Sequence, residues 1–261
     1  MKRFICLILP AAMLFSLGAC SVKNDIEGDA VTTTAPAPKL KETKQSKKFK
    51  DENGRVVFTV DVVLPEISKN AEKYIIEYVN DVINEVFEDA CENAQANIQN
   101  AANAMDNLGL DTPWSTKITF EETYMSGRYV CFLIENAFSM TGKEAEPSYS
   151  TKCFDIVNGM ECDAMYFAAE GMADYKVKYA VLDLIQEKAR SDFYAGGFKL
   201  TDEQVELIKN AFTLDSFYLT QNGFGFYFDK YIVDDSIYGT YRTEFTFAQL
   251  EGILVSPESV Q

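Results

Sequence analysis

The 261-residue sequence contains no histidine. Histidine is the usual general base of enzymes and a frequent metal ligand, so its absence excludes Ser-His and Cys-His nucleophile pairs and every histidine-containing metal site. The sequence also lacks a Gly-rich phosphate loop followed by Lys, a nucleophile elbow and a Cys-x-x-Cys pair. We therefore expect no metal ion and no cofactor.

Positive charge is scarce as well, with 24 Lys and Arg against 40 Asp and Glu and a formal net charge of -16. Binding of nucleic acid phosphates requires clustered Lys and Arg, so the composition excludes a nucleic acid partner. The hydrophobic fraction of 47% is ordinary for a globular protein. It supplies a core for one large domain or two small ones.

The N-terminus has the pattern of an export signal. Lys2 and Arg3 precede an apolar run, Phe4–Leu17, that is too short for a comfortable transmembrane helix. The run ends in Leu17-Gly18-Ala19-Cys20, which resembles the lipobox of bacterial lipoproteins. This resemblance implies a signal peptide over residues 1–19 and a lipid on Cys20, which would anchor the protein at the extracytoplasmic face of the bacterial cell membrane. The alternative is an ordinary secretory signal cut near Ala19, with Cys20 a free thiol.

Residues 20–50 have the composition of a disordered tether. A Thr-, Ala- and Pro-rich stretch, Thr32–Pro38, is followed by six lysines between Lys39 and Lys50. Such a segment cannot build a core and is expected to be solvated. Attachment of its lysines to anionic lipid or wall polymer is a second interpretation. The remaining residues, 51–261, carry 15 Lys and Arg against 36 Asp and Glu, a net charge of -21.

Residues 51–256 show mixed helical and strand periodicity. We expect a strand over Arg55–Leu64 that Pro65 ends, and a long helix from about Ala71 to about Met105, capped by Ser68 or Asn70. The second half of that helix is only weakly apolar and either extends into solvent or bends into a separate helix. Two further helices are predicted, over Tyr175–Arg190 and over Thr201–Phe212, the latter opened by a Thr201-x-x-Gln204 capping box.

Three hairpins are predicted between and after these helices. They join Lys117–Tyr124 to Arg128–Ser139, Ser148–Phe154 to Met160–Phe167 through Asn158-Gly159, and Phe217–Thr220 to Phe224–Phe228 through Asn222-Gly223. The strands at Tyr129–Ile134 and Phe224–Phe228 are apolar on both faces, which indicates central positions. The predicted fold class is α+β, with antiparallel hairpins packed against at least three helices. Its N-terminal part spans residues 51–145 and its C-terminal part 146–256.

The C-terminal stretch resembles a known family. The pattern consists of Phe217–Thr220, Asn222-Gly223, Phe226–Asp229 with Tyr231, Gly239, and a run from Phe245 that closes in a helix over Phe247–Leu254. It is similar to the RsiV-like extracytoplasmic domain, the outer part of a lysozyme-sensing anti-sigma factor, which also occurs beside a peptidoglycan deacetylase domain. The strand, Pro and long helix near residues 55–105 extend the resemblance. The family's Gly-Gly-Ala-His-like segment is missing at Thr141–Pro147.

Four cysteines follow Cys20, namely Cys91, Cys131, Cys153 and Cys162. An even count in an exported chain favours disulfides. Cys153 and Cys162 lie on opposite arms of the Asn158-Gly159 hairpin, where a two-residue loop would place them on one face, one diagonal step apart. We therefore predict a Cys153–Cys162 disulfide, with Cys91–Cys131 as a weaker second pair and buried free thiols as the alternative.

The resemblance implies a binding or sensing module without catalysis, whose ligand is a basic lysozyme-like protein or a cell-wall component such as peptidoglycan. No cytoplasmic domain precedes a membrane span, so we expect no anti-sigma activity, and the lack of histidine argues against a deacetylase. The alternative is a cell-wall hydrolase that uses two carboxylates. Its candidates are Glu121, Glu122, Asp229, Asp234 and Asp235. An aromatic set could stack on sugars but is expected in the core: Phe217, Tyr218, Phe224, Phe226, Tyr227, Phe228 and Tyr231.

Overall fold

The structure of the protein is a computed structural model. It describes residues 36–140, 142, 147–197, 199–228 and 241–260, which belong to one compact unit that begins at Thr34. The predicted signal peptide, Cys20 and the first part of the predicted tether lie outside the described residues. So do Asp229, Tyr231, Asp234, Asp235 and Gly239.

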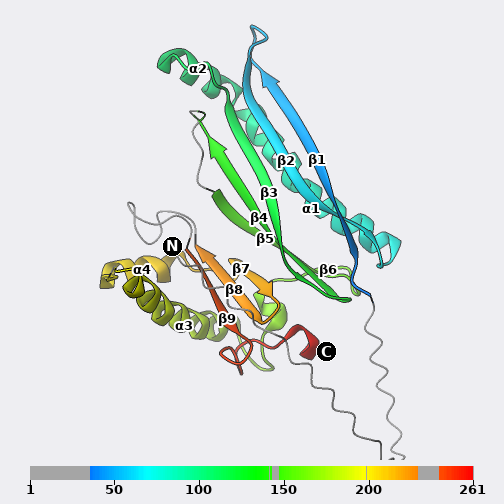
Figure 1. Ribbon diagram of the computed structural model, residues 1–261, viewed down its shortest axis with the longest axis vertical. Helices are drawn as coiled ribbons and strands as arrows, with labels where there is room; N and C mark the ends of the chain where they lie inside the picture. The colour runs from blue at the N-terminus through cyan, green and yellow to red at the C-terminus, as the bar shows by residue number, and fades with distance from the viewer. Residues whose placement is uncertain (1–35, 141, 143–146, 198, 229–240, 261) are drawn as a thin grey trace, which may run out of the picture. The chain divides into compact units, whose positions relative to one another are not determined.

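Six strands form a mixed sheet in chain order (Figure 1). They are β1 (Lys39–Lys50), β2 (Val56–Lys69), β3 (Trp114–Met125), β4 (Tyr129–Ser139), β5 (Pro147–Asp155) and β6 (Met160–Glu161). Neighbouring strands are antiparallel except β2 and β3, which are parallel. A parallel pair needs a long crossover connection, and the helices α1 (Lys73–Ala96) and α2 (Ile98–Leu108) provide it.

A second, antiparallel sheet has three strands, β7 (Phe217–Thr220), β8 (Gly223–Phe228) and β9 (Tyr241–Thr246), with β8 in the centre. Two helices, α3 (Asp174–Ala195) and α4 (Asp202–Ala211), contribute to its core, and α4 opens with the predicted capping box of Thr201 and Gln204. Short 3-10 helices, η1 (Ala164–Phe167) and η2 (Pro257–Ser259), complete the described elements. The predicted α+β fold with at least three helices is confirmed.

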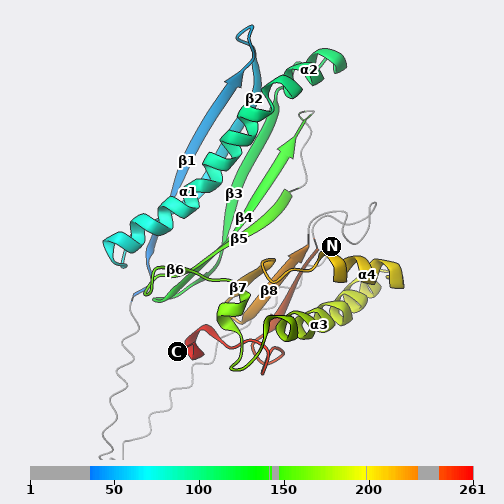
Figure 2. The same ribbon diagram turned by 180° about the vertical axis from the view of Figure 1, so that it is seen from behind.

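Strand β4 separates two hydrophobic cores, and Figure 2 shows α1 along one face of the six-stranded sheet. Val130, Phe132 and Ile134 pack into the core under α1. Tyr129, Cys131 and Leu133 alternate with them and pack into the core of the second sheet. All six residues are buried, as the sequence predicted for a strand that is apolar on both faces.

Several contacts join the two sheets directly. The Leu219 N–H donates to the Cys131 Sγ at 3.3 Å, and the Thr151 hydroxyl donates to the Phe217 carbonyl. The Arg242 guanidinium binds the Glu121 carboxylate at 2.9 Å. Within the second sheet, Gly225 lies opposite Tyr218, whose ring occupies the space that a Cβ at position 225 would need. A glycine is therefore required between the buried aromatics of β8.

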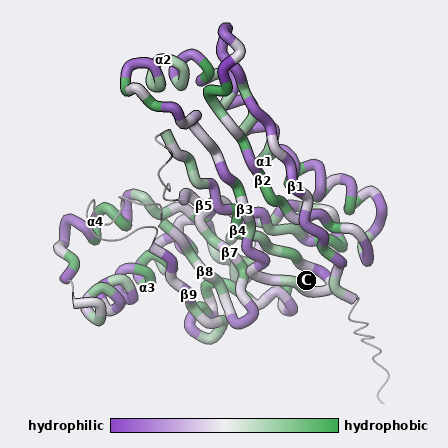
Figure 3. Tube along the Cα trace, turned by 45° about the horizontal axis from the view of Figure 1, so that its top comes forward, coloured by the Kyte–Doolittle hydropathy of each residue, from purple (hydrophilic) through white to green (hydrophobic). Residues whose placement is uncertain are grey.

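The predicted tether is wrong over its second part, because Lys39–Lys50 forms β1 and pairs with β2. Phe49 is buried against Phe58, with ring centroids 6.4 Å apart. Figure 3 shows β1 as largely hydrophilic, since its lysines are exposed. Lysines protect the open edge of a sheet from further pairing. A lysine-rich edge strand therefore has a composition that is easily taken for a linker.

Strand β2 runs through Pro65 to Lys69 rather than ending there. It pairs with β3 only from Phe58 to Val62. At Pro65 there is therefore no β3 partner that would need the N–H that proline lacks. The helix begins after Glu72 instead of Ser68 or Asn70, since Asn70 has a positive φ of 67° and its side chain binds the Ala37 carbonyl. It ends at Asn97, where α2 follows as a separate helix.

Two further local predictions are wrong. The stretch Phe247–Leu254 forms successive turns instead of a helix, because Gly252 adopts a positive φ of 76°, although Leu250 and Leu254 are buried as expected. The loop between β7 and β8 consists of Gln221 and Asn222, since Thr220 lies opposite Gly223. Among the described non-glycine residues only Asn70 has a positive φ, so this turn is not the type I′ turn that Asn-Gly suggested.

Candidate functional site

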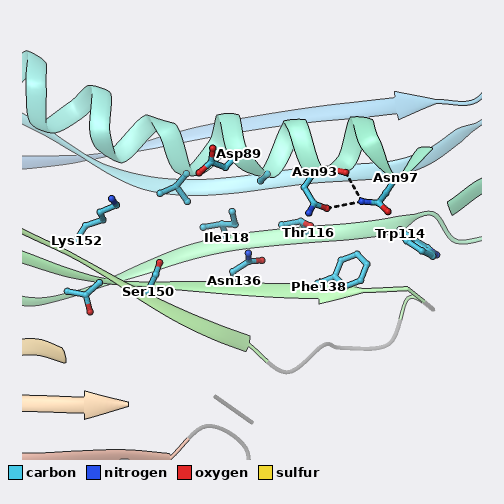
Figure 4. A pocket seen from close by; sticks show the side chains of 13 residues that line it. Asp89, Asn93, Asn97, Trp114, Thr116, Ile118, Asn136, Phe138, Ser150 and Lys152 are labelled. Carbon is cyan, nitrogen blue, oxygen red and sulfur yellow. Dashed lines mark hydrogen bonds between the residues drawn. The ribbon is translucent and has the colours of Figure 1, made fainter. Parts of the chain in front are cut away.

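A groove of about 670 Å³ lies between α1 and the exposed part of the neighbouring sheet face (Figure 4). Ligand sites in proteins commonly measure about 300–1,000 Å³. The wall of the groove is the C-terminal half of α1, which contributes Val86, Asp89, Ala90, Asn93 and Asn97. These residues recur at helical spacing, so one face of the helix supplies the whole wall.

The floor comes from three adjacent strands. Trp114, Thr116 and Ile118 belong to β3, Asn136 and Phe138 to β4, and Ser150, Thr151 and Lys152 to β5. Thr116 lies opposite Phe138 and Ile118 opposite Asn136, so these four side chains share one face of the sheet. Because the floor lies on regular strands, its side chains have fixed positions relative to one another.

The groove lies where the α1-side residues of β4 change from buried to exposed. On the α1 side, β4 is apolar at Val130, Phe132 and Ile134, and all three are buried. The next positions on that face are Asn136 and Phe138, which are exposed. The first half of α1 packs on β2 through Ile75 and Val79, whereas its second half turns Asn93 and Asn97 toward the floor (Figure 4).

Most of the side chains that line the groove are uncharged, and they include both polar and apolar groups. Asp89 and Lys152 are its charged lining residues, and Lys152 Nζ binds Glu161 at 3.0 Å. Asn97 Nδ2 donates to the Asn93 carbonyl at 2.9 Å and to Asn93 Oδ1 at 3.3 Å. The side-chain amide of Asn136 has no hydrogen-bond partner among the described residues. An amide both donates and accepts, so the site is suited to neutral polar groups.

Two aromatic rings close one end of the groove. Trp114 and Phe138 meet edge to face, with ring centroids 5.6 Å apart at 79°. Phe58 stacks on Phe138 at 5.9 Å, and 41% of Phe138 stays exposed. The indole Nε1 of Trp114 is buried and finds no hydrogen-bond acceptor in the described part of the chain. An unpaired buried donor is costly, so this end of the groove carries an unfavourable contribution to stability.

The residues singled out in the sequence lie elsewhere. Glu121 is paired with Arg242, and Glu122 follows it on the opposite face of β3, so these two carboxylates do not converge. The aromatic set is buried in the core of the second sheet, as expected: Phe217, Tyr218, Phe224, Phe226, Tyr227 and Phe228. Sequence reasoning missed the groove. Two weak signals were present, the single Trp of the chain at Trp114 and the four-residue spacing of Asn93 and Asn97.

The predicted disulfide is not formed, because all four described cysteines are free and buried. The loop after β5 has four residues, Ile156–Gly159, instead of two, so Cys153 and Cys162 lie directly opposite each other, and the Cys162 N–H donates to the Cys153 carbonyl at 2.7 Å. Cys131 lies opposite Cys153 on β4. Burial, and then the neighbouring thiols, raise the pKa of Cys153 well above its ordinary value. Cys91 belongs to α1 and is buried in the core on the other side of the sheet from Cys131, which excludes that pair.

A second polar cluster surrounds Asp155, which is fully buried. Its carboxylate accepts from Arg128 Nε at 2.9 Å, the Tyr166 hydroxyl at 2.7 Å and Asn158 Nδ2 at 2.9 Å. The N–H groups of Val157 and Asn158 also donate to it, at 2.9 and 3.0 Å. Burial alone would raise the pKa of Asp155, but these hydrogen bonds outweigh it and hold the pKa below its ordinary value. The cluster fixes the loop between β5 and β6.

No group of three or more metal-ligating side chains occurs within the described residues. None of the helices described is both long enough and sufficiently apolar to span a membrane.

The fold and the groove define an α+β protein whose long helix leaves part of its sheet open. No family model and no curated protein matches the sequence. Solved structures do match. A crystal structure of a DUF3298 family member from Bacteroides fragilis has a TM-score of 0.62 at 14% identity, over 87% of this chain and 98% of that chain. A DUF3298 family protein from Pseudomonas aeruginosa PAO1 has a TM-score of 0.56 at 11% identity, over 85% and 96%. Identities this low show a shared fold alone.

The Asp155 cluster predicts a specific dependence of stability on pH. Because the pKa of Asp155 is lowered on folding, its contribution is complete above about pH 4 and is lost as the pH falls through the folded-state pKa. At neutral pH, Asp155→Asn should lower the free energy of unfolding by about 1–3 kcal/mol, measured by urea denaturation. The difference from wild type should shrink below about pH 4. Asp215→Asn, which removes an exposed carboxylate, is the control. A difference that is constant or grows in acid would contradict the assignment.

Proposed function

We propose that the protein is a lipid-anchored binding module on the extracytoplasmic face of a bacterial membrane, and that the groove beside α1 holds a cell-wall component. The anchor is supported by the lipobox-like Leu17-Gly18-Ala19-Cys20. The binding site is supported by the groove, which is built on regular elements and whose lining supplies amides, hydroxyls and aromatic rings. Such a combination fixes the orientation of a polar ligand.

The observation that favours binding over hydrolysis is the acid content of the groove. Carboxylate-dependent glycosidases place two carboxyl groups about 5–9.5 Å apart across the scissile bond. Among the described residues that line this groove, Asp89 is the single carboxylate. The activity proposed here is therefore recognition without cleavage.

A basic lysozyme-like protein is the second candidate ligand, and α1 supplies the observation that favours it. Besides Asp89 in the groove, α1 carries five exposed carboxylates that do not line it: Glu77, Asp81, Glu85, Glu88 and Glu92. They would attract a basic protein and speed its association at low salt. This attraction needs the outer surface of α1, not the groove, so the two candidates respond differently to a blocked groove.

The first prediction of this proposal concerns the lipid anchor. Lipid on Cys20 should place the protein in the membrane fraction, and Cys20→Ser should release or misprocess it. Fractionation of cells followed by immunoblotting measures the distribution. If the Cys20→Ser protein stays with membranes to the same extent as wild type, the lipid anchor on Cys20 is ruled out.

The second prediction of this proposal concerns binding in the groove. The full-length protein in detergent should co-sediment with purified peptidoglycan sacculi and should release no soluble fragments from them. Ser150 is an exposed groove residue on β5, so Ser150→Arg should fill the site and raise the apparent Kd for sacculi at least about tenfold, a loss of about 1.4 kcal/mol. Ser46→Arg adds the same charge on the exposed edge strand β1 and should leave binding unchanged.

The same assay separates the alternatives. Release of soluble fragments would identify a hydrolase. Failure to bind sacculi, combined with capture of a basic lysozyme by wild type and Ser150→Arg alike, would support the acidic surface of α1 and contradict a groove ligand. Equal capture of any basic protein of similar charge would show that net charge alone is responsible.

A further inference from the structure

We infer that the ligand of the groove is an extended glycan built of N-acetylated sugars. This inference rests on the proposed function and names the chemistry that the groove recognises. It follows from three observations, namely the charge of the lining, the arrangement of the amides and the aromatic end.

The groove is close to neutral in a strongly acidic protein. Asp89 and Lys152 carry its charges, and Lys152 is paired with Glu161 at 3.0 Å, whereas the chain as a whole carries -16. A site for a phosphorylated or carboxylated ligand would offer free Lys or Arg side chains. The balance of charges here matches an uncharged ligand.

The amides are placed on two sides of the groove. Asn93 comes from α1, and Asn136, whose side chain has no hydrogen-bond partner among the described residues, comes from β4 (Figure 4). A side-chain amide can donate to a carbonyl and accept from an N–H at the same time. An acetamido group presents one N–H and one carbonyl that point in opposite directions. The Asn136 oxygen can therefore accept from its N–H, while Asn93 Nδ2, whose Oδ1 already accepts from Asn97, donates to its carbonyl.

The aromatic end supplies the remaining features of a sugar site. Phe138 keeps 41% of its surface exposed, which leaves apolar area for the C–H face of a sugar ring. The Trp114 ring also lines this end and meets Phe138 edge to face at 5.6 Å, which extends the aromatic surface.

The architecture favours a glycan over a peptide. Peptides commonly bind to a sheet by adding a strand at its edge. The central floor strands, β3 and β4, are both interior, and their backbone groups are engaged with neighbours. Recognition there must use side chains. The α1 wall from Val86 to Asn97 is about 16 Å long, which accommodates several linked sugar rings.

The single tryptophan of the chain provides a direct assay, because Trp114 lies in the groove. The full-length protein in a sugar-free detergent would be titrated with chitotetraose, while indole fluorescence and, in parallel, calorimetry are recorded. Saturable binding with a change in fluorescence is expected. Cellotetraose, which has the same linkage but no acetamido groups, should bind at least about tenfold more weakly.

Alanine substitutions in the groove test where chitotetraose binds. Asn136→Ala and Asn93→Ala should each raise the Kd for chitotetraose about 2- to 12-fold, the loss of one or two net hydrogen bonds. Both positions are exposed, so the fold should persist, which circular dichroism checks. Asn103→Ala removes an exposed amide from α2, outside the groove, and should leave the Kd unchanged.

The outcomes separate this inference from the proposed function. If sacculi bind and Ser150→Arg abolishes that binding, but chitotetraose does not bind by either method, the glycan inference is overturned and another wall component occupies the groove. Equal affinity for cellotetraose overturns recognition of the acetamido group. If neither sacculi nor chitotetraose binds, both proposals fail.

Discussion

Burial of β4 on both faces is the constraint on which the rest of the fold depends. From Tyr129 to Ile134 every side chain is buried, and alternate residues enter different cores. A strand of this kind cannot lie at an edge or face solvent, because either position would expose a row of large apolar groups. It therefore requires a neighbouring strand on each side and a hydrophobic layer on each face. The core under α1 supplies one layer, and the second sheet with its helices supplies the other.

The groove forms where β4 is no longer buried on the face that lies toward α1. After Ile134 the α1-side residues of β4 are Asn136 and Phe138, and the second half of α1 carries Asn93 and Asn97 in place of Ile and Val. There α1 and the sheet no longer pack closely against each other, yet the strands keep their regular register. The consequence is a polar, aromatic-ended site on rigid elements, the arrangement that holds binding groups at fixed positions.

The sequence predicted those elements whose signals are local. Apolar runs at Tyr129–Ile134 and Phe224–Phe228 placed central strands correctly, and Thr201 with Gln204 marked a helix start. Predictions failed where one composition suits two structures. The lysines of Lys39–Lys50 fit a linker or an edge strand, and only pairing with β2 decides between them. The groove was not predictable, because α1, β3, β4 and β5 each contribute polar residues that resemble ordinary surface positions.

The central claim is that the ligand occupies the groove between α1 and the floor strands. It is tested most directly by nuclear magnetic resonance of the isotope-labelled protein with soluble fragments of the cell wall. The Trp114 indole N–H and the side-chain amides of Asn93 and Asn136 give separate signals that report from the aromatic end, the wall and the floor. We expect these three signals to shift together and to show contacts to the ligand. Shifts confined to β1, to the second sheet or to the outer carboxylates of α1 would contradict it.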